Sequence, residues 1–177
     1  YIPELYNIQS NGHNVDKITI RSIMRHTTGL PRNSNYMLDV NNIQETITTA
    51  ESLKRLSEQS MITKPNRIPK YSNLAMTIAG EIIERVSGIK YEDYIENNIF
   101  KSLEMSDSNI PVTLGNNIYS AVGYVQLIDG KRNKHEWTKM SRGWGASAGA
   151  IESNIVDLSR FVKWHFNILK VKEDSII

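Results

Sequence analysis

The chain contains no cysteine among its 177 residues, and this absence excludes a disulfide, a thiol nucleophile and a thiolate metal site. It leaves the redox compartment undetermined. No stretch approaches the ~20 consecutive apolar residues of a membrane-spanning helix, so no membrane span is expected. Internal repeats and low-complexity tracts are missing as well. Residues 1–5 lack the charged and apolar regions of a signal peptide, so none is expected within this sequence.

The sequence also has little net charge. It has 21 Lys and Arg residues and 19 Asp and Glu residues, which give a formal charge of +2. The charges are scattered along the chain without a basic cluster. This pattern does not favour nucleic acid as a partner. The content of 40% hydrophobic and 23% charged residues is typical of a globular protein. We therefore expect residues 1–177 to form a single region that is large enough to bury a hydrophobic core.

Helical periodicity dominates what is present. The clearest helix is predicted from the apolar residues between 75 and 86, with Gly88 at the position of a C-terminal cap. Its apolar residues recur at helical spacing on one face: Ala75, Ile78, Ala79, Ile82, Ile83 and Val86. A short helix is predicted after Thr19, which can serve as its N-cap, and Gly29 followed by Pro31 gives its stop. Its apolar residues Ile20, Ile23 and Met24 share one face. Residues 31–42 are polar and predict a loop.

Further elements follow from the same rules. A helix is predicted over about 43–60, with Leu53 and Leu56 facing the core. Another helix is predicted over about 90–99, with Tyr91 and Tyr94 packed in the core. The β-forming residues between 118 and 137 surround Asp129-Gly130, which predicts an antiparallel hairpin. The last helix begins with a capping box, Asn154 and Asp157, and carries one apolar stripe: Leu158, Phe161, Val162, His165, Ile168 and Leu169. The fold class expected is α+β, mostly helical.

The tripeptide Tyr71-Ser72-Asn73 stands between a proline-containing loop, residues 64–70, and the clearest helix. A phenol and a carboxamide two residues apart can point to the same side of an extended backbone, where both could face one substrate. The structural alternative is that Tyr71 is an ordinary half-buried aromatic residue and Asn73 an N-cap.

The surroundings of this tripeptide give it a functional meaning. Residues 65–105 resemble the segment around the Tyr-x-Asn motif of the penicillin-recognising serine hydrolases, which include class C β-lactamases, D-alanyl-D-alanine carboxypeptidases and related esterases. Other segments match in the same order. Residues 1–5 resemble the stretch after the nucleophile helix, and residues 18–30 resemble the segment that ends in His-Thr-Ser-Gly-Leu. Residues 148–161 resemble the Ala-Gly-Gly block and the helix that follows it. The resemblance covers roughly residues 1–165.

The resemblance implies a fold and an activity. The fold would be the helical lobe of the β-lactamase/transpeptidase-like fold with a small antiparallel β-hairpin. Tyr71 would be the general base, acting with a lysine, and Asn73 would hydrogen-bond the amide of a β-lactam, D-alanyl peptide or ester substrate. Because a phenol normally has a pKa near 10, this task requires positive charge nearby. The family implies no cofactor and a location outside the bacterial cytoplasm.

Two family motifs are missing from this sequence: the Ser-x-x-Lys pair on a helix and the strand with Lys-Thr-Gly or His-x-Gly. The only literal Ser-x-x-Lys is Ser87 to Lys90, and Gly88 should end the helix between them. We therefore interpret the chain as an inner part of a catalytic domain, inactive alone. The alternative is a noncatalytic binding or regulatory module of the same lobe. Departures at Asn66, Glu104 and Ala150, where the family has glycine, affect local loops.

A second enzymatic hypothesis rests on residues 145–149, which satisfy the Gly-x-Ser-x-Gly pattern of α/β-hydrolases with Ser147 as nucleophile. No buried strand is predicted before it, and the triad candidates Asp157 and His165 follow too closely. A small-residue loop under a helix is the simpler interpretation. The four histidines lack metal-ligand spacing, so no metal site is expected. We expect His165 to pack in the core and His26 to cap the C-terminal end of its helix.

Overall fold

The computed structural model describes residues 1–34, 49–110, 121–134 and 145–174. The α-helices are α1 (Ile20–Met24), α2 (Thr49–Lys54), α3 (Asn73–Ser87), α4 (Tyr91–Ile95) and α5 (Ile155–Asp174). The strands are β1 (Tyr124–Gln126) and β2 (Arg132–Lys134). Short 3-10 turns are η1 (Pro3–Asn7), η2 (Val15–Lys17), η3 (Arg55–Glu58) and η5 (Ala146–Ala148), and η4 (Glu96–Phe100) is a π-helical turn. The α+β, mostly helical fold class is confirmed.

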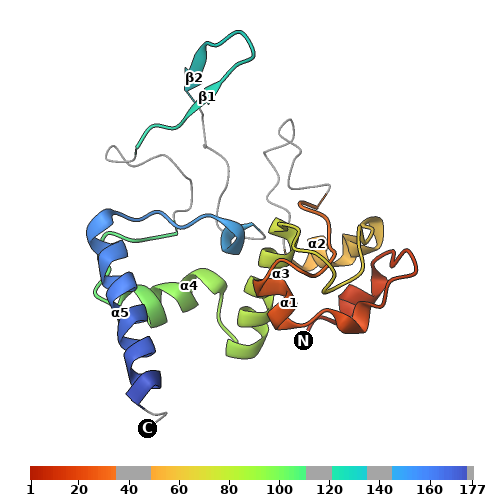
Figure 1. Ribbon diagram of the computed structural model, residues 1–177, viewed down its shortest axis with the longest axis horizontal. Coiled ribbons are helices and arrows are strands. Elements are labelled where there is room, and N and C mark those ends of the chain that lie inside the picture. The colour runs from red at the N-terminus through yellow and green to blue at the C-terminus, as the bar shows by residue number, and fades with distance from the viewer. Residues whose placement is uncertain (35–48, 111–120, 135–144, 175–177) are drawn as a thin grey trace.

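Helix α3 is the centre of the structure. In Figure 1, α1, α2 and the N-terminus lie on one side of it, and α4 and α5 lie on the other. The helix forms as predicted: the Ser72 hydroxyl accepts a hydrogen bond from Ala75 N, and Gly88 ends the helix in the left-handed conformation that glycine adopts readily. Its apolar residues are buried towards the N-terminal end, whereas Val86 is exposed. The first turns of α3 therefore supply its packing.

A first core cluster lies between α1, α2, η1 and α3. Its members are almost completely buried: Ile2, Ile8, Ile23, Leu30, Leu53, Leu56, Met61, Leu74, Ala75 and Ile78. Thr19 and Ser22 form a reciprocal capping box at the start of α1, so the predicted cap is confirmed. On α1 only Ile23 is buried, and Ile20 and Met24 are exposed.

Two predicted helices differ from the structure. The helix expected over 43–60 appears as α2 and η3, with Leu53 and Leu56 buried as predicted. Its first residues, 43–48, lie outside the described residues, as do residues 35–42 of the predicted loop. The helix expected over 90–99 is α-helical only to Ile95 and continues as the π-helical turn η4.

A second core cluster lies beside α4, η4 and η5. Phe100, Met105, Ile110, Ala146 and Ala150 are buried there. Tyr91 packs against this cluster, in agreement with its predicted packing role, while Tyr94 is partly buried.

One close contact connects this second cluster to α3. The Ser147 hydroxyl donates a hydrogen bond to Met76 O at 3.0 Å, and its side chain lies where a Cβ on Gly80 would be. Glycine at position 80 therefore permits η5 to approach the helix this closely.

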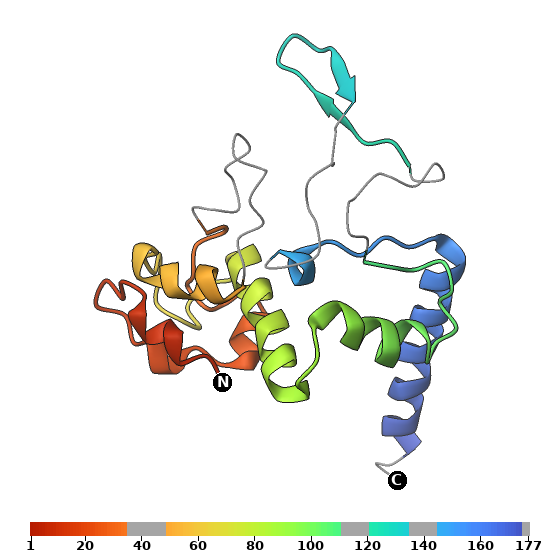
Figure 2. The ribbon, with the colours of Figure 1, turned by 180° about the vertical axis from the view of Figure 1, so that it is seen from behind.

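The hairpin is present as predicted but does not join the core. Strands β1 and β2 are antiparallel with Tyr124 opposite Lys134, and Gly130 has the positive φ of a tight turn. All six strand residues are exposed. Figures 1 and 2 both show the hairpin projecting away from the helices.

Helix α5 begins as predicted, with Asn154 Oδ1 accepting from Asp157 N at 2.9 Å. Much of its apolar stripe is nevertheless exposed, including Val162 and Leu169. The prediction that His165 packs in the core is wrong, because its side chain is exposed. The His165 ring instead contacts Phe161 and Trp164 of its own helix. No described helix has the length and apolar character required to cross a membrane.

Candidate functional site

Tyr71 lies on extended backbone before the N-terminus of α3, with half of its side chain exposed (50%). Its ring lies against two groups that the fold brings from more than 38 residues earlier in the sequence. The His26 imidazole centroid is 4.6 Å from the centroid of the Tyr71 ring. The Arg32 guanidinium carbon is 5.4 Å from the same centroid, within the range of a cation–π interaction. The phenol is therefore accessible and has a positive charge as a neighbour.

His26 follows the C-cap of α1 and has a positive φ of 54°. This conformation turns the chain so that it runs beside residues 70–72. His26 O accepts a hydrogen bond from Lys70 N at 2.7 Å. His26 Nδ1 accepts one from Ser72 N at 3.2 Å. An accepting Nδ1 carries no proton, so this geometry requires its proton on Nε2. The prediction that the His26 side chain caps its own helix is wrong, because that side chain supports the backbone next to Tyr71.

Asn73 is the first residue of α3, and Ser72 holds the N-cap position. The alternative that made Asn73 the N-cap is therefore wrong. Asn73 Nδ2 donates to Asn33 Oδ1 at 2.6 Å, and Asn73 N donates to Arg32 O at 2.7 Å. The Ser72 hydroxyl donates to Pro31 O at 2.7 Å. Residues 31–33 thus hold the N-terminus of α3 by hydrogen bonds from consecutive residues.

The same short segment contacts both predicted site residues. Arg32 lies over the ring of Tyr71, and Asn33 binds the carboxamide of Asn73. Ser72, between them, is completely buried and anchors the backbone. Sequence reasoning missed Arg32, Asn33 and the supporting role of His26. The signal that could have found them is the matched segment 18–30, which ends directly before these residues.

The literal Ser-x-x-Lys motif does not form a helical pair. Ser87 is the last residue of α3, Gly88 is left-handed, and Lys90 is the N-cap residue of α4. The Ser87 hydroxyl donates to Ile83 O at 2.7 Å and accepts from Ile89 N at 3.3 Å. It is a helix-end hydrogen-bonding group with no contact to the Lys90 amine.

The α/β-hydrolase hypothesis is not supported by the geometry. The Ser147 hydroxyl, half-buried, donates to Met76 O. Asp157 binds residues 107 and 108 and Arg160, and His165 Nδ1 lies 3.2 Å from Phe161 O. No hydrogen bond joins Ser147, Asp157 and His165 to one another in the described part of the chain, so these residues do not form a triad.

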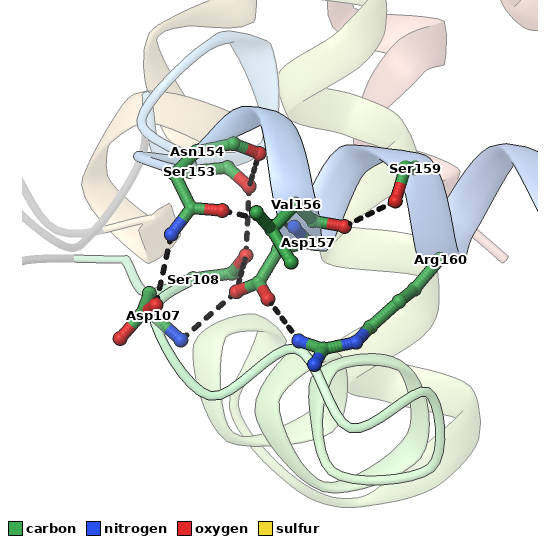
Figure 3. Close-up of polar contacts among 8 residues, drawn as sticks. All are labelled: Asp107, Ser108, Ser153, Asn154, Val156, Asp157, Ser159 and Arg160. Carbon is green, nitrogen blue, oxygen red and sulfur yellow. Dashed lines mark hydrogen bonds and ion pairs between the residues drawn. The ribbon is translucent and has the colours of Figure 1, made fainter.

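Asp157 instead connects two parts of the fold (Figure 3). Its fully buried carboxylate accepts hydrogen bonds from Asp107 N and the Ser108 hydroxyl, both at 2.9 Å, and from Arg160 Nη1 at 2.6 Å. Burial by itself would raise the pKa of Asp157, but these donors stabilise the ionised form and hold its pKa below the ordinary value. The residue is a structural anchor between the segment after α4 and the start of α5.

Within the described ranges, no group of three or more His, Asp or Glu side chains is arranged to hold a metal ion. The groups gathered at Tyr71 and Asn73 are a phenol, a carboxamide and a guanidinium. Such groups can accept a proton, orient an amide and attract negative charge, respectively.

Comparison with known proteins agrees with the resemblance seen in the sequence. The family model described as Beta-lactamase matches residues 1–176. The chain is 28% identical over 162 residues to the putative penicillin-binding protein PbpX of Bacillus subtilis (strain 168). It is 30% identical over 157 residues to Beta-lactamase-like protein 4 of Dictyostelium discoideum. These alignments cover 91% and 82% of this chain but only 37% and 26% of the relatives, so the chain spans well under half of their length.

Solved structures share the fold. A class C beta-lactamase mutant superposes with a TM-score of 0.65 at 23% identity, covering 92% of this chain and 40% of that one. The D-amino acid amidase from Ochrobactrum anthropi SV3 superposes with a TM-score of 0.65 at 24% identity, covering 85% and 45%. The expected fold, a helical portion of the β-lactamase/transpeptidase fold with a hairpin, is confirmed.

Proposed function

The chain belongs to the beta-lactamase family, and from this premise we propose that it is the inner part of a serine hydrolase, here called the parent protein. It would contribute Tyr71 and Asn73 to an active site whose nucleophilic serine and lysine lie in the rest of the parent. The observation that carries the proposal is the arrangement at residues 31–33. This segment holds the carboxamide of Asn73 and places a guanidinium over the half-exposed Tyr71 ring.

In the proposed reaction, the Tyr71 oxygen takes the proton of the serine hydroxyl and passes its own proton to the lysine amine, as the serine oxygen attacks the acyl carbon. This proton returns through Tyr71 to the amine or alcohol of the substrate, which leaves as an acyl-enzyme remains. Tyr71 then takes a proton from the water that attacks this ester and gives it to the serine oxygen as the acid product leaves. Asn73 hydrogen-bonds the amide of the substrate and orients it, because its own orientation is set by Asn33.

The proposed substrates are β-lactams, D-alanyl peptides or esters. Amides of D-amino acids join this group because a D-amino acid amidase shares the fold. As part of the same proposal, the parent acts outside the cytoplasm of a bacterium.

The chain alone should be inactive. Its two candidate serines, Ser87 and Ser147, use their hydroxyls in hydrogen bonds to backbone atoms of α3. We expect the purified chain to give neither colour with a chromogenic cephalosporin nor a covalent mass shift. Either result above the blank would reject this part of the proposal.

The role of Tyr71 is tested in the parent protein. Tyr71→Phe should lower kcat by about 10²- to 10⁴-fold, the usual contribution of a general base. Tyr94→Phe, on half-buried Tyr94 of α4, is the matched control and should leave kcat unchanged. A parent that binds substrate without turnover, even when a Ser-x-x-Lys helix precedes Tyr1, would favour the alternative of a noncatalytic binding module.

A further inference from the structure

The two segments that surround the candidate site have an unusual charge distribution. Residues 17–33 and 59–80 contain seven basic residues and no Asp or Glu. The rest of the sequence holds 14 Lys and Arg against 19 Asp and Glu. The seven cations are Lys17, Arg21, Arg25, Arg32, Lys64, Arg67 and Lys70. Together with the exposed apolar residues among them, they are called the basic face below.

Hydrogen bonds join the two segments side by side. Asn66 connects them through its Nδ2, which donates to Lys17 O at 3.2 Å, and through its backbone N, which donates to Thr27 O at 2.8 Å. Lys70 N donates to His26 O, and Ile62 N donates to Gly29 O. Cations that are dispersed along the sequence are therefore carried by two adjoining segments of the fold.

Within the described residues, no ion pair involves a cation of the basic face. Six of the seven cations are exposed, and Lys70 is partly buried. The ion pairs of the described residues involve other cations: Arg55, Arg85, Lys101, Lys131 and Arg160. Clustered like charges repel one another and create a surface potential that attracts anions. A binding partner with negative charge would relieve this repulsion.

Exposed apolar side chains lie among these cations. Ile20 and Met24 are 49% and 63% exposed and stand one turn apart on α1, beside the pair Arg21 and Arg25. Ile68, 48% exposed, follows Arg67 in the loop that crosses the end of α1. A soluble polyanion would need only the cations. The mixture of basic and apolar side chains is that of protein surfaces that bind the headgroup region of an anionic bilayer.

We propose that the basic face docks the protein on an anionic lipid bilayer. The cations contact lipid phosphates, and the exposed side chains of Ile20, Met24, Ile62 and Ile68 enter the headgroup region. This inference goes beyond the proposed function and does not depend on the chemistry of Tyr71. Because Arg32 also lies over the Tyr71 ring, docking would place the candidate site beside the bilayer.

The test is sedimentation of the purified chain with vesicles of phosphatidylcholine alone or with about 30% phosphatidylglycerol. We expect binding only to the anionic vesicles, and weaker binding in high salt. Each lost cation should weaken binding about fivefold, so Arg21→Gln with Arg67→Gln should weaken it about 25-fold. Arg132→Gln with Lys134→Gln removes the same charge from the exposed hairpin and should change binding less than twofold. Arg21→Lys with Arg67→Lys keeps the charge and should bind like the unmodified chain.

A second experiment distinguishes binding to a bilayer from binding to a soluble polyanion. Met24→Ser with Ile68→Ser should reduce vesicle binding at least fivefold and leave binding to polyphosphate unchanged. The proposal is overturned if neutral and anionic vesicles bind equally, or if the hairpin variant loses as much affinity as the basic-face variant. It is also overturned if the serine variant binds vesicles as well as the unmodified chain, which would assign the face to a soluble polyanion. Circular dichroism of each variant verifies that it is folded.

Discussion

The N-terminal region around α1 to α3 and the C-terminal helix α5 are both well-formed structure, but they are stabilised differently. In the first region, Leu30, Leu74 and Ile78 are completely buried in one cluster. On α5, Phe166 and Leu169 are 61% and 57% exposed. The comparison teaches that caps and helical periodicity are enough to define a helix, whereas burial of its apolar face requires another element against it.

The attachment of α5 shows the same difference. Phe161 packs against the second core cluster, and the buried carboxylate of Asp157 collects hydrogen bonds from the segment after α4. Polar contacts and one apolar contact at its first turns thus attach α5, whereas extensive apolar burial stabilises α3. The predictions below test this contrast.

The largest effect should come from the core of α3. Leu74→Ala should lower the free energy of unfolding by about 2–5 kcal/mol, because it leaves a cavity in a fully buried position. Leu169→Ala on α5 makes the same chemical change at an exposed position and should cost no more than about 0.5 kcal/mol. Urea denaturation measures both. Equal losses would show that the exposed stripe of α5 is buried in solution.

The next largest loss should follow Asp157→Asn, which removes the charge that the three donors stabilise. A lowered pKa in the folded state means that the carboxylate stabilises the fold above the ordinary value of 3.8 and that this stability is lost as the pH falls towards the folded pKa. The urea midpoint of the variant should therefore be lower at pH 7 and closer to that of the unmodified chain at pH 3. Ser159 is an exposed neighbour on α5, and Ser159→Ala should leave the urea midpoint unchanged at both pH 7 and pH 3.

A smaller effect is expected where η5 meets α3. Gly80→Ala places a methyl group against the Ser147 side chain and should cost about 1–3 kcal/mol through overpacking. Ser147→Gly in the same protein should recover part of this loss, since it removes the atoms that clash. A double-mutant cycle measures the coupling. Additive losses would contradict a direct contact between η5 and α3.

The smallest effect concerns Glu84, whose carboxylate accepts a hydrogen bond from Tyr91 N at 2.9 Å. Burial raises its pKa above the ordinary value of 4.5, and the neighbouring Glu81 and Glu92 raise it further. The folded state then prefers the protonated form, so stability falls as the pH rises from 4.5 through the raised pKa. Glu84→Gln keeps the acceptor without the charge and should stabilise the chain at pH 7 by at most about 0.5 kcal/mol after solvent screening. A variant less stable than the unmodified chain at pH 7 would contradict this sign.

Much of the fold could be predicted from the sequence because its signals are local. The spacing of apolar residues from 75 to 86 with Gly88 defines α3, Thr19 caps α1, and Asp129-Gly130 turns the hairpin. The family resemblance directed attention to Tyr71 and Asn73, whose proposed roles remain predictions. The partners of these residues could not be predicted, because Arg32 and Asn33 lie about 40 residues away in the sequence. The same holds for His26, whose side chain turns away from its own helix to meet Ser72.

The sequence by itself therefore determined that α1 follows Thr19, that α3 ends at Gly88, that α5 follows Asn154 and that the hairpin turns at Asp129-Gly130, since caps, turns and periodicity act over a few residues. The end of α1 at Met24 comes before the predicted stop at Gly29. Only the tertiary structure decided which apolar faces are covered, that Asn33 orients Asn73, and that the two segments carrying seven dispersed cations lie side by side. The physical reason is the sequence separation over which each effect acts. Burial and electrostatic potential depend on which distant segments come into contact, and local sequence patterns contain no information about that choice.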